Sequence, residues 1–197
     1  ERAVFEELPE ATVLRTAWLY TGARRVALEI PGGDFVATMI RLEAQRETLT
    51  VVDDQWGSPT DVTTLTSQIL EMLAAEKTKR IDTSGAVHHV TDAGRATWFE
   101  LARAVFRELG ADPERVRPCS SEEFPRPAPR PAFSVLADSR WCELGLTPVE
   151  DWRTSLARGM SVLGAQELGA QDSPGSMDTG SSSSPDTSAP TGGDGTR

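Results

Sequence analysis

The chain has 197 residues, of which 38% are hydrophobic, and a formal net charge of −10 at pH 7. An acidic balance of this size argues against non-specific binding of nucleic acid or of a membrane surface, and no apolar run approaches the ~20 residues of a membrane span. The two cysteines, Cys119 and Cys142, lack metal-ligand spacing and indicate reduced thiols in a cytoplasmic protein rather than a disulfide framework.

Strand and helix patterns alternate along most of the chain. The predicted elements are, in order, a helix over residues 1–8, a strand over 12–20, a helix after Asp34, a strand over 49–52, a helix after Thr60 or Asp61 with Val62, Leu65, Ile69 and Leu73 on one face, and a strand over 86–90. This alternation predicts an α/β sheet with at least some parallel pairing.

Two capping boxes follow. Thr97 and Glu100 precede a strongly amphipathic stretch that ends at Gly110, and Thr147 and Glu150 precede a second one. Each pair predicts the first turn of a helix.

The end of the chain divides into an extended segment and a tail. Proline occupies every second position over residues 125–131, which favours a hydrogen-bond-poor crossing strand. Residues 166–197 are dominated by Ser, Gly, Thr, Asp and Pro, which cannot bury enough apolar surface to offset the entropy of ordering. We therefore predict one α/β domain over residues 1–165 and a disordered tail over 166–197.

The most specific motif spans residues 52–60, Val-Asp-Asp-Gln-Trp-Gly-Ser-Pro-Thr. It describes a strand that runs into a turn at Gly57 and Pro59 and then into a helix N-terminus, whose free N–H groups can face a ligand. By spacing alone, an ordinary strand-to-helix loop is the favoured interpretation of this motif.

This motif resembles the signature of the dTDP-4-dehydrorhamnose reductases, members of the extended short-chain dehydrogenase/reductase superfamily. Three more stretches are similar to that family in the same order: residues 14–20, Leu-Arg-Thr-Ala-Trp-Leu-Tyr; residues 33–39, Gly-Asp-Phe-Val-Ala-Thr-Met; and the proline-rich residues 124–136. The resemblance covers residues 1–163. It implies the C-terminal part of a Rossmann-type NAD(P)-binding fold together with the small substrate-binding subdomain.

The resemblance also implies an activity, the reduction of the C4 ketone of dTDP-4-dehydro-L-rhamnose by NADPH or NADH. In this family a Tyr-x-x-x-Lys pair handles the proton and a glycine-rich turn binds the cofactor. Here the only tyrosine, Tyr20, is followed four residues later by Arg24, and no three glycines have Gly-x-x-Gly-x-x-Gly spacing. We therefore expect no catalytic residue within this chain, a truncated start, and no activity from the chain alone.

The site residues implied by the resemblance belong to the sugar-nucleotide pocket and the nicotinamide edge. The expected substrate-binding residues are Trp18, Gln55, Gly57, Thr60, Arg126 and Arg130, and the expected cofactor contacts are Thr16 and Ala17. The expected ligand is a dTDP-sugar, and the expected partner is a second copy or the missing N-terminal half. A magnesium ion is implied by some relatives without ligands that can be assigned here. The adjacent His88 and His89 point to opposite faces of a strand and do not suggest a metal site.

Three departures from the family pattern leave alternatives open. Residues 24–31 look like an insertion, Asp34 replaces an asparagine, and Asp61 stands where an aromatic residue is common. The alternatives are a non-catalytic, reductase-like binding or regulatory subunit, and a reductase-like protein for another dTDP-deoxysugar.

Overall fold

The computed structural model describes residues 1–124, 127–128, 130–137 and 139–171. Its helices are α1 (Arg2–Glu7), α2 (Ala23–Ala27), α3 (Phe35–Gln45), α4 (Val62–Lys77), α5 (Trp98–Glu108), α6 (Ser139–Glu143) and α7 (Trp152–Gln171), with 3-10 turns η1 (Pro113–Arg115) and η2 (Ser121–Glu123). Its strands are β1 (Val13–Arg15), β2 (Leu19–Tyr20), β3 (Leu49–Val52), β4 (Trp56–Gly57), β5 (Thr60–Asp61), β6 (Val87–His89), β7 (Ala96–Thr97) and β8 (Val116–Cys119).

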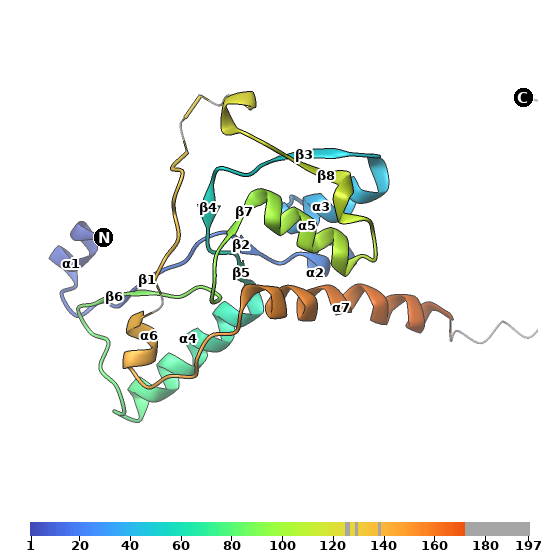
Figure 1. The fold of residues 1–197 in the computed structure, drawn as a ribbon. Coiled ribbons are helices and arrows are strands. Elements are labelled where there is room, and N and C mark those ends of the chain that lie inside the picture. Colours follow the sequence, from blue (N-terminus) through green and yellow to red (C-terminus); the bar gives the residue numbers. More distant parts are fainter. Residues whose placement is uncertain (125–126, 129, 138, 172–197) are drawn as a thin grey trace, which may run out of the picture.

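The strands form short pairs that are mostly parallel. β1 pairs with β6, β2 with β5 and β3 with β8 in parallel, whereas β4 and β7 are antiparallel (Figure 1). In every parallel pair the partners are far apart in the sequence and helices lie between them, as parallel connections require. The predicted α/β class with parallel pairing is confirmed.

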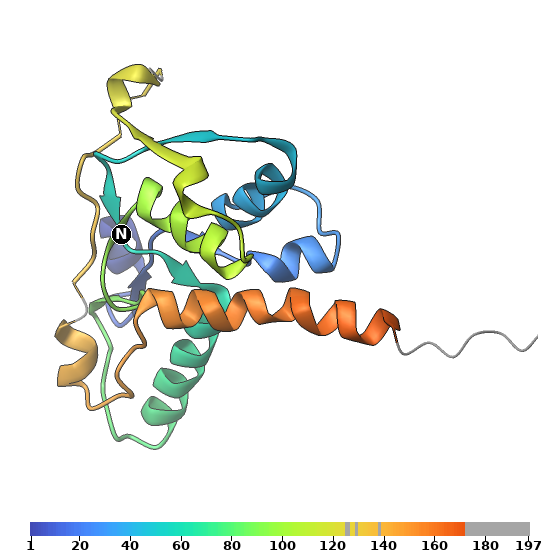
Figure 2. The same cartoon turned by 45° about the vertical axis from the view of Figure 1, so that its right-hand side comes forward.

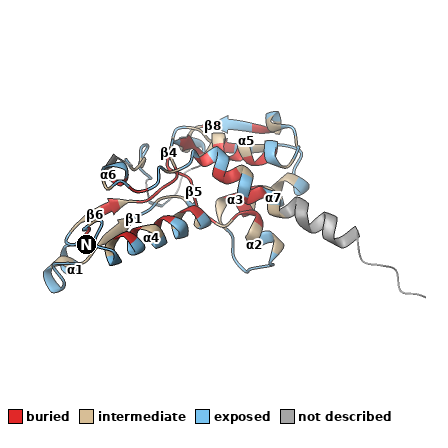
Figure 3. Ribbon diagram, turned by 90° about the horizontal axis from the view of Figure 1, so that it is seen from below, coloured by how far each residue is buried: buried red, intermediate tan, exposed pale blue. Residues whose placement is uncertain are grey.

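Two apolar clusters hold the fold together. The larger one joins α3, α5 and the first turns of α7 around fully buried residues such as Phe106, Trp152 and Leu156. The smaller one packs Met72 and Ala75 of α4 against Trp141 and its neighbours. Figure 3 shows the buried residues concentrated in α3 and α5, whereas α1 is largely exposed.

The most buried side of α4 differs from the apolar face that the sequence predicted. Leu65 of that face packs against the smaller cluster, but Leu73 is 53% exposed, and the buried residues are Thr64, Gln68, Met72 and Ala75. The helix is turned because polar groups at its start are held by α7: the Thr64 hydroxyl lies 3.3 Å from that of Ser155 and accepts a hydrogen bond from Arg158.

One predicted capping box is confirmed and the other is wrong. In α5 the Thr97 hydroxyl accepts from the N–H of Glu100, and the Glu100 carboxylate accepts from the N–H of Thr97. Thr147 instead donates its N–H and its hydroxyl to Glu71 on α4, and Glu150 pairs with Arg158. α7 therefore begins later than predicted, at Trp152, where the Asp151 carboxylate accepts from the N–H of Arg153.

The predicted strand over residues 12–20 is interrupted. Trp18 has φ of 45°, a left-handed conformation that separates β1 from β2. Residues 132–134 extend beside β4, because the N–H of Trp56 donates to the carbonyl of Ala132 and the N–H of Ser134 donates to that of Trp56. Residues 125, 126 and 129 of the predicted crossing strand lie outside the described residues.

The C-terminal helix α7 leaves the body of the molecule (Figure 2). It continues to Gln171, past the predicted boundary at residue 165. Residues 172–197 of the predicted tail lie outside the described residues. Within the described ranges no helix is both long and apolar enough to cross a membrane.

Candidate functional site

A cavity of about 800 Å³ lies beside the sequence motifs. Its lining comes from the start of α3, the strand β3 with the motif that follows it, the start of α5, and the segment after η2. The lining residues are Gly33, Asp34, Phe35, Thr38, Met39, Thr50, Val51, Val52, Gln55, Trp98, Ser121, Glu122, Phe124, Ala128 and Arg130. Of the predicted site residues, Gln55 and Arg130 face this cavity.

The two aspartates of the motif each hold one wall. Asp53 accepts a 2.6 Å hydrogen bond from the Thr97 hydroxyl, which fixes the start of α5. Asp54 accepts from both the N–H and the hydroxyl of Ser121, each at 2.8 Å, and these bonds lower the pKa of Asp54. The motif thus positions both walls, and Gln55 lies between them.

The aromatic wall of the cavity is formed by Trp98 and Phe35 rather than by Trp18. Trp18 stacks on Trp98 with ring centroids 3.5 Å apart and an interplanar angle of 9°, and Phe35 is tilted against Trp98 at 4.6 Å. Trp98 and Phe35 were missed by the sequence analysis. The capping box at residues 97–100 was the available signal for Trp98, since it places that residue in the first turn of a helix.

Gly57 and Thr60 lie beneath this aromatic wall. A Cβ atom on Gly57 would stand 2.1 Å from the Trp18 ring, so only glycine leaves room for the indole. Thr60 is fully buried in β5, and its N–H donates to the carbonyl of Trp18. Neither residue lines the cavity, and both determine where Trp18 lies.

Asp34 joins the cavity wall to the chain before it. Its Oδ1 accepts from the N–H of Ala37 and caps α3, while its Oδ2 accepts from the N–H and hydroxyl of Thr21 and the N–H of Gly22. Burial opposes ionisation of this carboxyl, but these hydrogen bonds outweigh burial and hold the pKa of Asp34 below its usual range. All these bonding partners are donors, so a carboxylate can accept from every one of them, whereas the NH₂ group of an amide could not.

The variant Asp34→Asn is expected to lower the free energy of unfolding by about 1 kcal/mol, because its NH₂ group would face the N–H donors of Thr21 and Gly22. Urea denaturation measures the loss. Asp112→Asn is the matched control, since Asp112 accepts a backbone hydrogen bond through Oδ1 alone, which an amide oxygen replaces. Equal stability of the two variants would contradict this account of Asp34.

The remaining predicted residues lie at or beyond the edges of the site. Arg130 is exposed and reaches the cavity, and Arg126 falls outside the described residues. Thr16 and Ala17 follow the carboxyl end of β1, which is the edge at which open α/β sheets bind ligands. No glycine-rich phosphate-binding turn is among the described residues, so the part of the chain that the structure describes offers no such turn for the diphosphate of a dinucleotide.

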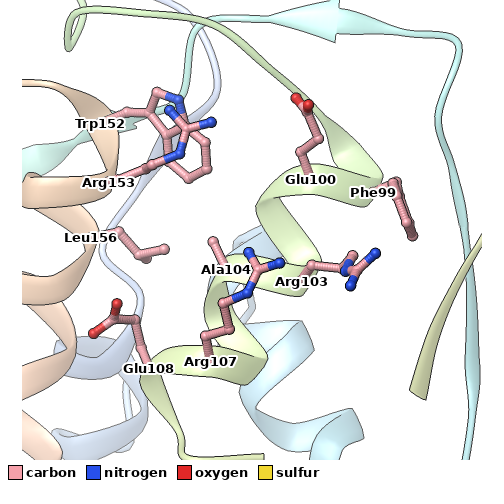
Figure 4. Close-up of a pocket in the computed structure, with 9 residues that line it drawn as sticks. All are labelled: Phe99, Glu100, Arg103, Ala104, Arg107, Glu108, Trp152, Arg153 and Leu156. Atoms are coloured by element: carbon pink, nitrogen blue, oxygen red, sulfur yellow. The ribbon is translucent and has the colours of Figure 1, made fainter. Parts of the chain in front are cut away.

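A second hollow, of about 340 Å³, lies between α5 and α7 (Figure 4). Three arginines surround its apolar floor, but two of them are already engaged. Arg103 pairs with Glu114, and Arg153 lies 3.6 Å from Asp151 and stacks over Trp152. Its charges do not converge on one point, so the larger cavity is the better candidate site.

In the part of the chain that the structure describes, neither the tyrosine nor a metal-binding cluster supplies a reactive centre. The Tyr20 hydroxyl is buried away from the cavity, and burial together with Asp92 raises its pKa. In the ranges that the structure covers, no three His, Cys, Asp or Glu side chains group as a metal site requires, so the magnesium expectation has no support.

Comparison with known proteins gives related sequences. A family model for the RmlD substrate binding domain matches residues 1–164. A dTDP-4-dehydrorhamnose reductase of Mycobacterium tuberculosis is 47% identical over 162 residues, which are 82% of this chain and 49% of that protein. A dTDP-4-keto-6-deoxy-D-glucose reductase of Streptomyces niveus is 45% identical over 168 residues, 85% of this chain and 53% of that protein. The chain spans about half the length of these curated relatives.

Solved structures give the same picture. A dTDP-4-dehydrorhamnose reductase of Clostridium acetobutylicum matches with a TM-score of 0.64 and 32% identity, covering 78% of this chain and 49% of that one. The Bacillus anthracis reductase, solved in complex with NADP, matches with a TM-score of 0.63 and 32% identity, covering 77% and 48%. The predicted fold class is therefore confirmed.

Proposed function

This chain belongs to the RmlD substrate binding domain family, and from that premise we propose that it is the nucleotide-sugar half of a dTDP-4-dehydrorhamnose reductase. The reaction would convert the C4 ketone of dTDP-4-dehydro-L-rhamnose to the alcohol of dTDP-L-rhamnose. The observation that carries this proposal is the 800 Å³ cavity whose opposite walls are held by Asp53 and Asp54.

The lining of the cavity suits a nucleotide sugar. The indole of Trp98 and the ring of Phe35 offer flat apolar surface for a base or for the apolar face of a sugar. Arg130 offers a guanidinium that can bind diphosphate oxygens bidentately. Because Asp34 and Glu122 make the rest of the rim acidic, we expect the diphosphate to lie toward Arg130.

The nicotinamide would lie at the carboxyl end of β1, beside Thr16 and Ala17. Bound there, NADPH or NADH supplies the hydride. β1 pairs with β6 along one edge, and no strand among the described residues pairs with its other edge. Since parallel sheets are rarely two strands wide, we propose that this edge receives a strand of the cofactor-binding half of the reductase.

Isothermal titration tests the binding part of the proposal. We expect dTDP and dTDP-rhamnose to bind the chain without a nicotinamide, and NADPH alone to give no binding heat. The variant Arg130→Gln should weaken dTDP binding by about tenfold, equivalent to ~1.4 kcal/mol, because a charge-assisted contact to phosphate is lost.

Arg107→Gln is the matched control for Arg130→Gln. Arg107 belongs to the α5–α7 hollow and has the same chemistry, so its replacement should leave the Kd for dTDP unchanged. Absence of dTDP binding by the unaltered chain would reject the proposal, and equal weakening by both variants would place the nucleotide elsewhere.

A second candidate is a reductase-type protein for another dTDP-deoxysugar. The Streptomyces niveus relative, named for a different dTDP-sugar, is nearly as similar to this chain as the Mycobacterium tuberculosis one. Tighter binding of dTDP-rhamnose than of dTDP-glucose would favour the first candidate, and the reverse order would favour the second.

A further inference from the structure

The short helix α2 carries two adjacent arginines, and each faces one of two aspartates. Nη1 of Arg24 lies 3.3 Å from Oδ2 of Asp61, and Nε of Arg25 lies 3.7 Å from Oδ2 of Asp34. Residues 24–31, Asp34 and Asp61 are the three departures from the family pattern named above. The pairs made by Arg24 and Arg25 connect all three in the fold.

Arg25 also holds the chain that leads into the cavity wall. Its Nη1 donates a 2.6 Å hydrogen bond to the carbonyl of Pro31, and its Nε donates to the Thr21 hydroxyl at 3.1 Å. That hydroxyl in turn donates to Asp34 at 2.8 Å. The Thr21 hydroxyl therefore links the guanidinium to the carboxylate that caps α3.

The segment between Ile30 and Asp34 has little else to hold it. Residues 31–33 are exposed, and the Arg25 bond to Pro31 is the one hydrogen bond made by this segment among the described residues. Gly32 has φ of 83° and lies against the guanidinium. Gly33, Asp34 and Phe35, which come next, line the 800 Å³ cavity.

We propose that Arg25 is a positioning residue that fixes the Gly33–Phe35 wall of the cavity and so determines how tightly a nucleoside diphosphate sugar is held there. The proposal rests on the proposed function for the ligand class, whereas the fixing of the wall rests on the contacts alone. Arg25 acts through Pro31, Thr21 and Asp34 and does not line the cavity itself.

Arg25 has a second, electrostatic effect on the same wall. Its guanidinium balances the Asp34 carboxylate, which lies on the rim that an anionic ligand must approach. The two effects separate experimentally. Added salt screens the repulsion that an unbalanced carboxylate exerts on the ligand, but salt does not restore the hydrogen bonds.

The test compares three variants of the full chain. Arg25→Gln removes both the charge and the guanidinium contacts. Arg25→Lys keeps the charge but cannot bond Pro31 and Thr21 together in the same way. Arg24→Gln is the matched control, because Arg24 neighbours Arg25 on α2 but pairs with the buried Asp61 away from the cavity.

Hydrogen exchange of the peptide covering residues 31–37 and the Kd for dTDP are measured for each variant. We expect both Arg25 variants to exchange faster than the unaltered chain. We expect Arg25→Gln to weaken dTDP binding by about tenfold and Arg25→Lys by about fivefold, with the Arg25→Lys defect unchanged at high salt. Arg24→Gln should lower the Tm and leave the Kd unchanged.

Each outcome decides something. Unchanged exchange in both Arg25 variants overturns the proposal whether or not dTDP binds. Faster exchange with an unchanged Kd overturns it too, since the wall would then be irrelevant to the ligand. If the unaltered chain does not bind dTDP, the proposed function fails, and the exchange measurement still decides whether Arg25 fixes the wall.

Discussion

Replacement of Gly57 by alanine is expected to lower the free energy of unfolding by about 3 kcal/mol, because the new methyl group would overlap the Trp18 ring and break its stack on Trp98. The ideal Cβ position is 2.1 Å from the nearest Trp18 atom, far inside van der Waals contact. Trp18 has little freedom to retreat, since it is already in the left-handed region and its ring lies 3.5 Å from Trp98.

Thermal denaturation and near-ultraviolet circular dichroism check this result together. The first gives the loss of stability, and the second reports the coupling of the two stacked indoles, which should disappear. Gly159→Ala is the matched control, because a Cβ there meets Oδ2 of Asp61 at an ordinary 3.4 Å. Because Gly159 lies inside α7, its replacement by alanine should raise the free energy of unfolding by about 0.5–1 kcal/mol. If the Gly57→Ala variant had the same Tm as the unaltered chain, that result would contradict the packing of Trp18 over Gly57.

Replacement of Asp92 by asparagine is expected to raise the free energy of unfolding at pH 7 by about 2 kcal/mol. Asp92 is 1% exposed, and burial raises its pKa from 3.8 to about 6 despite a hydrogen bond from the N–H of Asp61. At pH 7 the folded chain therefore holds an unfavourable buried charge, although Thr64 and Ser155 also favour the ionised form of the carboxyl. An asparagine keeps an oxygen for Asp61 and removes that charge.

The sign of the pH dependence follows from the raised pKa. Between about pH 4 and pH 6 the folded state binds the Asp92 proton and the unfolded state does not, so stability falls as the pH rises through this window. The stabilising effect of the proton is complete below the unfolded pKa and is lost above about 6. The difference in unfolding free energy between Asp92→Asn and the unaltered chain should therefore grow from pH 4 to pH 6 and then level off.

Asp82→Asn serves as the control for this titration. The pKa of Asp82 is lowered, through hydrogen bonds from Ser84, so its contribution has the opposite sign and is lost only as the pH falls below the window. Urea denaturation at several pH values measures both variants. A difference curve for Asp92→Asn that is flat from pH 4 to pH 7 would refute a raised pKa at this position.

Several features of the fold could be predicted because their causes are local. The caps at Asp34 and Thr97 depend on donors within one turn of the same helix, so the sequence contains all the information they need. The Thr147–Glu150 box has the same local pattern, yet Thr147 donates to Glu71, which is 76 positions away. A local sequence pattern shows which hydrogen bonds a residue is able to make. Which of them forms depends on the residues that the fold brings near it.

The site shows the same division. The motif at residues 52–60 could be recognised because a strand-to-helix turn at a sheet edge needs only a few residues. The predicted residues Gln55 and Arg130 both line the cavity, and their binding roles stay predictions. The capping box places Trp98 in the first turn of a helix, but its stack on Trp18 and the burial of Gly57 beneath Trp18 were not predictable. Both contacts join residues that are far apart in the sequence, and no periodicity in the sequence carries that information.

The sequence by itself determined the α/β class, the family, and the segment around which the site is built, since these follow from short-range propensities and from residues within a few positions of one another. Only the tertiary structure showed what the individual residues of that segment do. Asp53 holds α5 through Thr97, which is 44 positions away, and Asp54 holds η2 through Ser121, which is 67 positions away. The physical reason is that a carboxylate can accept from many equivalent donors, and only the packed fold brings one of them within hydrogen-bonding distance.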